Sequence, residues 1–189
     1  MNAQEPKSHY HLLPLGRLRE SLSNLKRADI IIHTKHSGET KPHMAKTVSK
    51  YSTAPQLVSK NKYKILQYKS NQYESMNIPD MKAAVAFCGI AHPESFTKTL
   101  DALGVEISDL HCFNDHQEYN AKILERLQTS LVMSQSKSII TTEKDLVKLP
   151  DSFIKNLDVY ILRMSMELTA KSRENMIQQL SKIKSRKTS

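Results

Sequence analysis

An adjacent carboxylate and imidazole, Asp115 and His116, are the first candidates for acid–base chemistry in this sequence. Histidine titrates near neutral pH, and a neighbouring carboxylate can fix its tautomer, so the pair could position a base or accept a proton. The alternative is loop hydrogen bonding, because dipeptides of this kind also occur by chance. The residues alone leave both interpretations open.

Two arginines, Arg17 and Arg19, stand two residues apart in a turn that contains Gly16. A guanidinium group pairs with phosphate oxygens in a bidentate way, so this turn could bind a substrate or cofactor phosphate. Ordinary solvated surface charge is the alternative.

Two further groups of polar residues follow predicted strands. The first, at a strand-to-helix junction, comprises Thr142, Glu143, Lys144 and Asp145. Thr142 could cap the helix, and a helix N-terminus attracts anions, so this group is either an active-site edge or a simple cap. The second, Thr34 and Lys35, ends an apolar run and could line the same edge of the sheet, although strand ends are commonly polar.

These candidates need a scaffold, and its clearest part is a strand–helix–strand unit. Residues 83–88 form an apolar run that predicts a strand, and Pro93 suits the first position of a helix, where its missing N–H is harmless. Gly104 suits the left-handed residue that ends a helix. Residues 105–112 then predict a second strand, which carries His116 beyond its carboxyl end. In α/β sheets, ligands usually bind at that edge.

Strands and helices alternate in the rest of the chain. Further strands are predicted at 28–35, 63–68, 138–142 and 159–164, and helices at 21–27, 42–52, 118–131, 143–149 and 170–184. Residues 69–80 show no period and are predicted to be a loop. The alternation predicts an α/β fold with a mostly parallel, helix-flanked sheet. We expect disorder at 1–11, one α/β lobe at 12–170, and a basic helix and tail at 171–189.

The charge balance favours a polyanionic partner. Lys and Arg outnumber Asp and Glu by 28 to 19, which gives a formal net charge of +9. Nucleic acid, nucleotide, phosphorylated lipid and an acidic membrane surface all fit this charge. No apolar run approaches the roughly 20 residues of a spanning helix, and residues 1–11 lack the hydrophobic core of a signal peptide. We expect a chain that stays in the cytosol or touches a membrane only at its surface.

Several kinds of site are not expected. The eight histidines are scattered without a metal-ligand spacing, so no metal site is predicted. Cys88 and Cys112 fall on predicted strands and are interpreted as small core residues in a reducing compartment. The sequence contains no GxxxxGK[ST], GxGxxG or GxSxG motif. With four glycines in all, no loop of this sequence could wrap a triphosphate with backbone amides by itself.

Four segments taken together resemble a known family. In order they read LLPLGRLRESLSNLKRADIIIHTK, FCGIAHPESF, FNDH and ITTEKDLVKL. They resemble the carboxyl-terminal half of the tetraacyldisaccharide 4'-kinases of lipid A biosynthesis, over residues 12–164. The resemblance implies part of a P-loop, Rossmann-like kinase fold that lacks the Walker A half. It also implies ATP- and Mg²⁺-dependent transfer of the γ-phosphate to the 4'-hydroxyl of the lipid A disaccharide precursor, at the cytoplasmic face of the bacterial inner membrane.

The resemblance also implies roles for individual residues. Arg17 and Arg19 match the family's L-R-E turn near the active site, where they would bind substrate or phosphate. Asp115 and His116 match its D-H motif, in which the histidine orients an aspartate base, and residues 142–145 match its T-E-K-D motif. The implied partners are the lipid A disaccharide precursor, the acidic inner-membrane surface and a separately encoded amino-terminal half; nucleic acid is not expected.

The sequence departs from the family pattern in three places. The family's Walker A loop and D-D-x-F-Q-H motif belong upstream of Arg17, which only sixteen residues precede here. Ser21 stands where the family often has proline, and Gln117 where a second histidine is common. Phosphoryl transfer depends mostly on positioning and charge neutralisation, so we expect the chain alone to be catalytically incomplete. A truncated reading frame or half of a split gene would explain this pattern.

Two other functions remain as alternatives. One is a non-catalytic basic α/β domain that binds phosphorylated lipid or nucleic acid, and the other is a purely structural remnant. Within residues 171–187, Met176, Ile177, Leu180 and Ile183 are predicted to face inward. The basic residues of that segment could then face an anionic membrane.

Overall fold

The structure, a computed structural model, describes residues 7–34, 43–78 and 81–186. The chain divides into two compact units, one made of residues 1–62 and 165–189 and the other of residues 63–164. We call them the terminal unit and the central unit. The range 12–170, for which the sequence predicts one lobe, is therefore shared between both.

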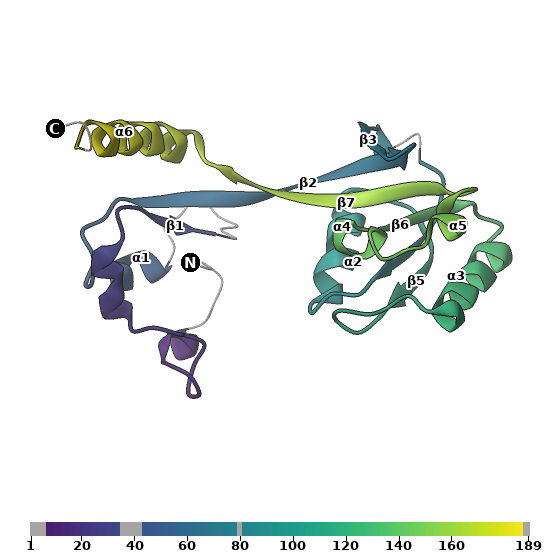
Figure 1. The fold of residues 1–189 in the computed structure, drawn as a ribbon, viewed down its shortest axis with the longest axis horizontal. Coiled ribbons are helices and arrows are strands. Elements are labelled where there is room, and N and C mark those ends of the chain that lie inside the picture. Colours follow the sequence, from purple (N-terminus) through teal and green to yellow (C-terminus); the bar gives the residue numbers. More distant parts are fainter. Residues whose placement is uncertain (1–6, 35–42, 79–80, 187–189) are drawn as a thin grey trace. The chain divides into compact units, whose positions relative to one another are not determined.

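The central unit is built on a mostly parallel sheet (Figure 1). Its middle strand β4 (Ala84–Cys88) pairs in parallel with β5 (Ile107–Cys112) on one side and β6 (Ser138–Thr142) on the other. β6 pairs in parallel with β7 (Asp158–Leu168), and β2 (Gln56–Lys69) follows in the order β2-β7-β6-β4-β5. The predicted α/β architecture is confirmed.

Helices cover both faces of this sheet. Residues Ala84, Ala86 and Cys88 of β4 pack in one cluster with α2 (Pro93–Ala102), whereas Val85 and Phe87 pack in a second cluster with α3 (Ala121–Met133). The short helices α4 (Glu143–Leu146) and α5 (Asp151–Ile154) also contribute to the second cluster. All five residues of β4 are buried, as expected of a parallel strand covered on both faces.

Local signals fix the ends of these helices. Pro93 is the first residue of α2, and Gly104 beyond its end has a left-handed φ of 75°. The side chain of Asn120 caps α3 by accepting a hydrogen bond from the backbone N–H of Ile123. Tyr119 is buried but lies before α3, so this helix begins later than predicted.

The prediction of a loop at residues 69–80 is wrong in its first part. β3 (Gln72–Ser75) pairs antiparallel with the end of β2 and forms a hairpin. Its two turn residues, Ser70 and Asn71, have φ values of 49° and 62°. Two successive positive φ values are typical of a type I′ hairpin turn, whose strongest sequence signal is glycine. Ser-Asn lacks that glycine, so the turn was missed.

The terminal unit contains a smaller set of elements. They are η1 (Lys7–Tyr10), η2 (Leu22–Arg27), β1 (Ile31–His33), α1 (His43–Val48), the first part of β2, the last part of β7 and α6 (Ala170–Arg186). β1 pairs in parallel with β2, and Ile31, Met44 and Val48 form a small buried cluster. Residues 7–10 form a 3₁₀ helix, whereas the disorder expected for residues 1–6 concerns residues outside those described.

Helix α6 does not follow the predicted pattern of burial. Its first turn is anchored because the buried Ser172 accepts a hydrogen bond from the backbone N–H of Val58, at 2.9 Å. Ile177 and Leu180, which were predicted to face inward, are 62% and 54% exposed. The prediction is wrong for these two residues, while the side chains of residues 182–189 lie outside those described.

Cys112 also differs from its prediction. Cys88 is buried as expected, whereas its in-register neighbour Cys112 is exposed, because β5 is the last strand in the order of the described sheet. None of the helices in the described residues is both long enough and apolar enough to cross a membrane.

Candidate functional site

The predicted D-H and T-E-K-D residues meet at the carboxyl edge of the central sheet. Asp115 and His116 lie in the loop between β5 and α3, while residues 142–145 form the end of β6 and the start of α4. Nζ of Lys144 lies 2.7 Å from Oδ1 of Asp115. The two motifs therefore form one cluster within the central unit.

His116 has an unusual backbone conformation. It lies in a four-residue turn closed by a hydrogen bond from the N–H of Gln117 to the carbonyl of Asn114, at 3.2 Å. Its φ is 61°, a left-handed value that a type II turn requires at this position and that favours glycine or asparagine. A histidine in such a conformation costs free energy, which is a reason to look for a function of its side chain.

The imidazole of His116 is accessible and lies beside the carboxylate of Asp115. Its side chain is 80% exposed, and Nε2 lies 3.8 Å from Oδ2 of Asp115. The hydrogen bond from Lys144, together with its charge, holds the pKa of the Asp115 carboxyl below its ordinary value. Asp115 therefore stays ionised beside the imidazole.

Asp145 is the buried anchor of this edge. Its fully buried carboxylate accepts hydrogen bonds at Oδ2 from the Thr142 hydroxyl, at 2.7 Å, and from the backbone N–H of Gly89, at 3.0 Å. The Thr142 hydroxyl in turn caps α4, at 3.2 Å from the backbone N of Asp145. Lys148 completes the set, with Nζ 3.5 Å from Oδ1 of Asp145. The capping role weighed for Thr142 is therefore present.

Glu143 faces a different partner. It binds Arg163 of β7 through Nε at 2.8 Å and Nη2 at 2.5 Å, and the Arg163 guanidinium lies 4.3 Å from the ring centroid of Tyr73. The pKa of Arg163 is raised, mainly by its hydrogen bond to Glu143. Glu143 is thus held in an ion pair on the sheet and points its charge at Arg163 instead of at Asp115.

Three residues of this edge were not identified from the sequence: Gly89, Lys148 and Arg163. Lys148 and Arg163 look like ordinary surface cations in the sequence, because the groups that they contact are distant along the chain. Gly89 carried a weak signal, since it stands between a buried strand and the loop before Pro93. A Cβ at Gly89 would lie 3.1 Å from Oδ1 of Asp145 and 3.1 Å from Cβ of Gln117.

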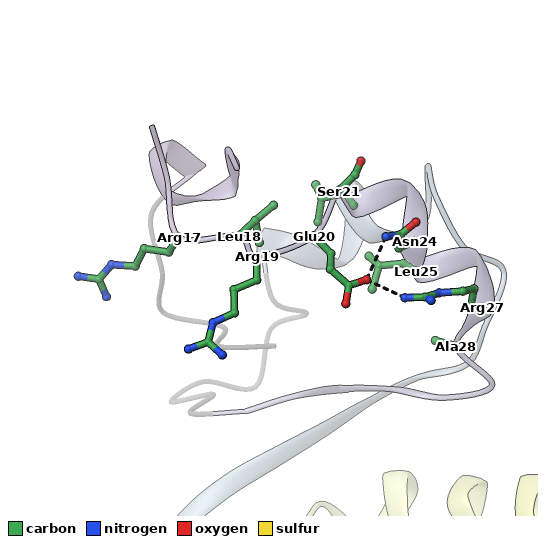
Figure 2. A pocket seen from close by; sticks show the side chains of 10 residues that line it. Arg17, Leu18, Arg19, Glu20, Ser21, Asn24, Leu25, Arg27 and Ala28 are labelled. Carbon is green, nitrogen blue, oxygen red and sulfur yellow. Dashed lines mark hydrogen bonds and ion pairs between the residues drawn. The ribbon is translucent and has the colours of Figure 1, made fainter. Parts of the chain in front are cut away.

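Arg17 and Arg19 lie in the terminal unit, on a groove of about 640 Å³ that the 3₁₀ helix η2 also lines. Figure 2 shows both side chains extending away from Glu20. The Glu20 carboxylate instead accepts hydrogen bonds from Asn24, at 2.9 Å, and Arg27, at 2.6 Å. An open groove lined by arginines fits the predicted contact with a phosphate group.

The remaining predictions concern Thr34 and Lys35, which were expected at the edge of the sheet, and metal binding. Lys35, proposed for the sheet edge, lies outside the described residues, whereas Thr34 directly follows β1 in the terminal unit. Across residues 7–34, 43–78 and 81–186, no three or more His, Cys, Asp or Glu side chains gather closely enough to hold a metal ion.

Comparison with known proteins gives one consistent family. A family model described as tetraacyldisaccharide-1-P 4'-kinase matches residues 1–182. The chain is 31% identical to the tetraacyldisaccharide 4'-kinase of Vibrio parahaemolyticus over 92% of its length, and 33% identical to that of Desulfotalea psychrophila over 86%. These matches cover 45% and 47% of the two relatives, so the chain spans about half the length of the curated relatives that it matches.

A solved structure shares the fold. The crystal structure of LpxK from Aquifex aeolicus in complex with ATP superposes with a TM-score of 0.62 and 22% identity, over 91% of this chain and 48% of that one. This likeness confirms the partial kinase-type α/β fold that the sequence resemblance implied.

Proposed function

The chain belongs to the tetraacyldisaccharide 4'-kinase family, and from this membership we propose that it forms the carboxyl-terminal part of a lipid A 4'-kinase. The complete enzyme would transfer the γ-phosphate of ATP to the 4'-hydroxyl of the lipid A disaccharide precursor. The observation that carries the proposal is the family match over residues 1–182, in a chain whose D-H and T-E-K-D residues meet at one sheet edge.

In this proposal His116 is the catalytic residue of the chain. Its exposed imidazole would hydrogen-bond a carboxylate base supplied by the other half of the enzyme and keep that base aimed at the sugar hydroxyl. Asp115, ionised beside it, would favour the tautomer that the imidazole needs. Arg17 and Arg19 would bind phosphate oxygens of the substrate, because guanidinium groups match them in a bidentate way.

The residues present fit only part of the cofactor requirement. ATP, when bound, supplies the phosphoryl group that is transferred. The arginine-lined groove of the terminal unit fits a phosphate contact, but the described residues offer no acidic cluster for Mg²⁺, and we assign no residue of this chain to the metal. The phosphate-cradling loop and the Mg²⁺ ligands would therefore come from an amino-terminal half, as a separately encoded chain or as the rest of a longer one.

The complete enzyme would work at the cytoplasmic face of the bacterial inner membrane as a peripheral protein. The formal net charge of +9 supports attraction to an acidic surface, at about 1 kcal/mol for each basic residue close to it. The basic segment 171–189 is the proposed contact. Co-sedimentation with anionic vesicles should decrease when its Lys and Arg residues are replaced by Gln; equal sedimentation of both proteins would exclude this contact.

A grafted enzyme tests the function directly. Residues 12–189 are fused to, or co-expressed with, the amino-terminal half of the Vibrio parahaemolyticus relative, and phosphate transfer from ATP to a tetraacyldisaccharide acceptor is measured. We expect turnover with the native chain and a fall of about 10²- to 10⁴-fold for His116→Ala, the usual contribution of an acid–base group. Unchanged turnover of His116→Ala would remove the catalytic role. Absence of turnover with a correctly folded graft would count against the kinase assignment.

The rival function is a basic domain that binds phosphorylated lipid without chemistry. The arginine-lined groove is the observation that favours it. Turnover of the grafted enzyme separates the two functions, because such a domain would bind anions through Arg17 and Arg19, with or without His116, and would transfer no phosphate.

A further inference from the structure

Two lysines, Lys144 of the T-E-K-D segment and Lys148 three residues after it, hold the His116 turn from both sides. Lys144 binds the residue before His116, through the 2.7 Å contact with Oδ1 of Asp115. Lys148 binds the residue after it, because Nζ of Lys148 donates a hydrogen bond to the backbone carbonyl of Gln117, at 3.0 Å. Lys144 lies in α4, and Lys148 lies in the turn that follows the end of this helix at Leu146.

The two lysines are not equivalent. Lys144 and Asp115 are 40% and 39% exposed, so water competes with their contact. Lys148 is only 27% exposed, and its ammonium group also lies 3.5 Å from the fully buried Oδ1 of Asp145. It lies 5.9 Å from the ring centroid of Tyr119 as well. Lys148 therefore has a fixed position, set by a carboxylate that is itself anchored.

The anchor connects three segments of the sheet edge. Asp145 accepts hydrogen bonds from the backbone N–H of Gly89 after β4 and from the Thr142 hydroxyl at the end of β6. Lys148 then extends this connection to the loop after β5 through the carbonyl of Gln117. The position of the His116 turn is thus tied to the two strands β4 and β6, through polar contacts that are buried or partly buried and therefore stronger than fully exposed ones.

Such a tie is needed because the turn is strained. A non-glycine residue at a φ of 61° persists only when the surrounding structure holds it there. The side chain of His116 contributes nothing to this by packing, since it is 80% exposed. The hydrogen bond from Lys148 to the Gln117 carbonyl holds the peptide unit between Gln117 and Glu118, which directly follows the turn, and so restricts how far the turn can relax.

We propose that Lys148, held by Asp145, is a positioning residue that fixes the left-handed His116 turn and so aims the imidazole. The part of this inference that concerns turnover rests on the proposed kinase function. The part that concerns the turn does not, because it is a property of the chain without substrate.

The first test measures the turn in the chain alone. In ¹⁵N relaxation experiments on the 189-residue chain, Lys148→Met should increase the fast motion of the His116 and Gln117 amides and shift their resonances. Lys148→Arg keeps the charge and the donors and should restore the native behaviour. Lys155→Met, an exposed lysine after α5, is the matched control and should leave both amides unchanged. Native relaxation of both amides in Lys148→Met would overturn the proposal.

The second test measures catalysis in the grafted kinase. Lys148→Met should lower kcat at least about tenfold, with KM for ATP changed less than about twofold, because a misaimed imidazole affects the transition state and not nucleotide binding. Lys148→Arg should recover most of the loss. A lower melting temperature with native kcat per folded molecule would show a merely structural lysine and overturn the proposal.

The two tests also separate this inference from the proposed function. If the turn loosens in the Lys148→Met chain but the His116→Ala graft keeps full turnover, Lys148 positions the turn and His116 has no catalytic role. If the turn stays rigid in the Lys148→Met chain but the His116→Ala graft is inactive, the positioning role of Lys148 is rejected and the kinase function is retained.

Discussion

Lys144 and Asp115, which are 29 residues apart in the sequence, form an ion pair of 2.7 Å between Nζ and Oδ1. The pair joins the loop after β5 to the first turn of α4. The carboxylate of the D-H motif thus pairs with the lysine of the T-E-K-D motif. Two patterns that are separate in the sequence are therefore parts of the same edge of the central sheet.

The first prediction concerns the charge of Asp115. Its pKa is held low mainly by the hydrogen bond from Lys144, so Lys144→Gln should raise it toward the ordinary value of about 3.9. A lowered pKa means that the native carboxyl stays ionised at pH values where an ordinary aspartate is already half protonated. The titration of the Asp115 carboxyl carbon by NMR measures this directly. Lys155→Gln is the control, and equal Asp115 titration in all three proteins would contradict the structure.

The second prediction separates stability from function at His116. Glycine adopts a φ of 61° without the steric cost that histidine bears, about 1–2 kcal/mol. Glycine also loses more conformational entropy on folding, which offsets about 0.5–1 kcal/mol of that gain. His116→Gly should therefore leave the melting temperature equal or slightly raised, while turnover of the grafted kinase falls as it does for His116→Ala. A clear loss of stability in His116→Gly would mean that the imidazole supports the fold.

The third prediction concerns the two cysteines. Burial, with the neighbouring Cys112 thiol as a further cause, raises the pKa of Cys88 to about 12, so it carries almost no reactive thiolate near neutral pH. Cys112 is exposed on β5. A thiol-specific chromogenic reagent should therefore modify one cysteine in the native chain and both in guanidinium chloride. Cys112→Ser should abolish the native reaction; rapid modification of that variant would show that Cys88 is accessible.

The sequence predicted the parts of the fold that local chemistry determines. Pro93 and Gly104 marked the ends of α2 correctly, because the ring of proline and the missing Cβ of glycine act on their own backbone. The hairpin at Ser70 was missed because its turn uses no glycine. The exposure of Cys112 could not be predicted either, since it depends on β5 being the last strand in the order of the described sheet and not on the residues around it.

The motif residues of the candidate site could be predicted from the sequence, but the contacts that hold them in place could not. Asp115 and His116 were identified by residue type, and the carboxyl ends of parallel strands were expected to share an edge. Lys148 and Arg163 were not identified, because each depends on a partner that is close only after folding. Asp145 was grouped with the active-site edge, whereas it is fully buried and binds backbone and side-chain groups of the protein.

The last prediction concerns Gly89, which lies close to both the Asp145 carboxylate and the His116 turn. Its φ is not left-handed, so glycine is required here by space and not by backbone conformation. A Cβ would lie 3.1 Å from Oδ1 of Asp145, 3.1 Å from Cβ of Gln117 and 3.2 Å from the carbonyl oxygen of Asn114. These contacts are a few tenths of an ångström too short, so one neighbour must move.

Asp145 is buried and held by Thr142, whereas Asn114 and Gln117 belong to the surface turn. The turn should therefore yield first, and Gly89→Ala should displace it. We expect a stability loss of about 1–3 kcal/mol, the usual cost of overpacking, and a disproportionate fall in kcat of the grafted kinase. Chemical-shift changes in Gly89→Ala should centre on His116. Gly104→Ala, at an open position with a φ of 75°, is the matched control: it should cost stability and leave kcat per folded molecule unchanged. Equal effects of the two substitutions on kcat would mean that the site does not depend on the space at Gly89.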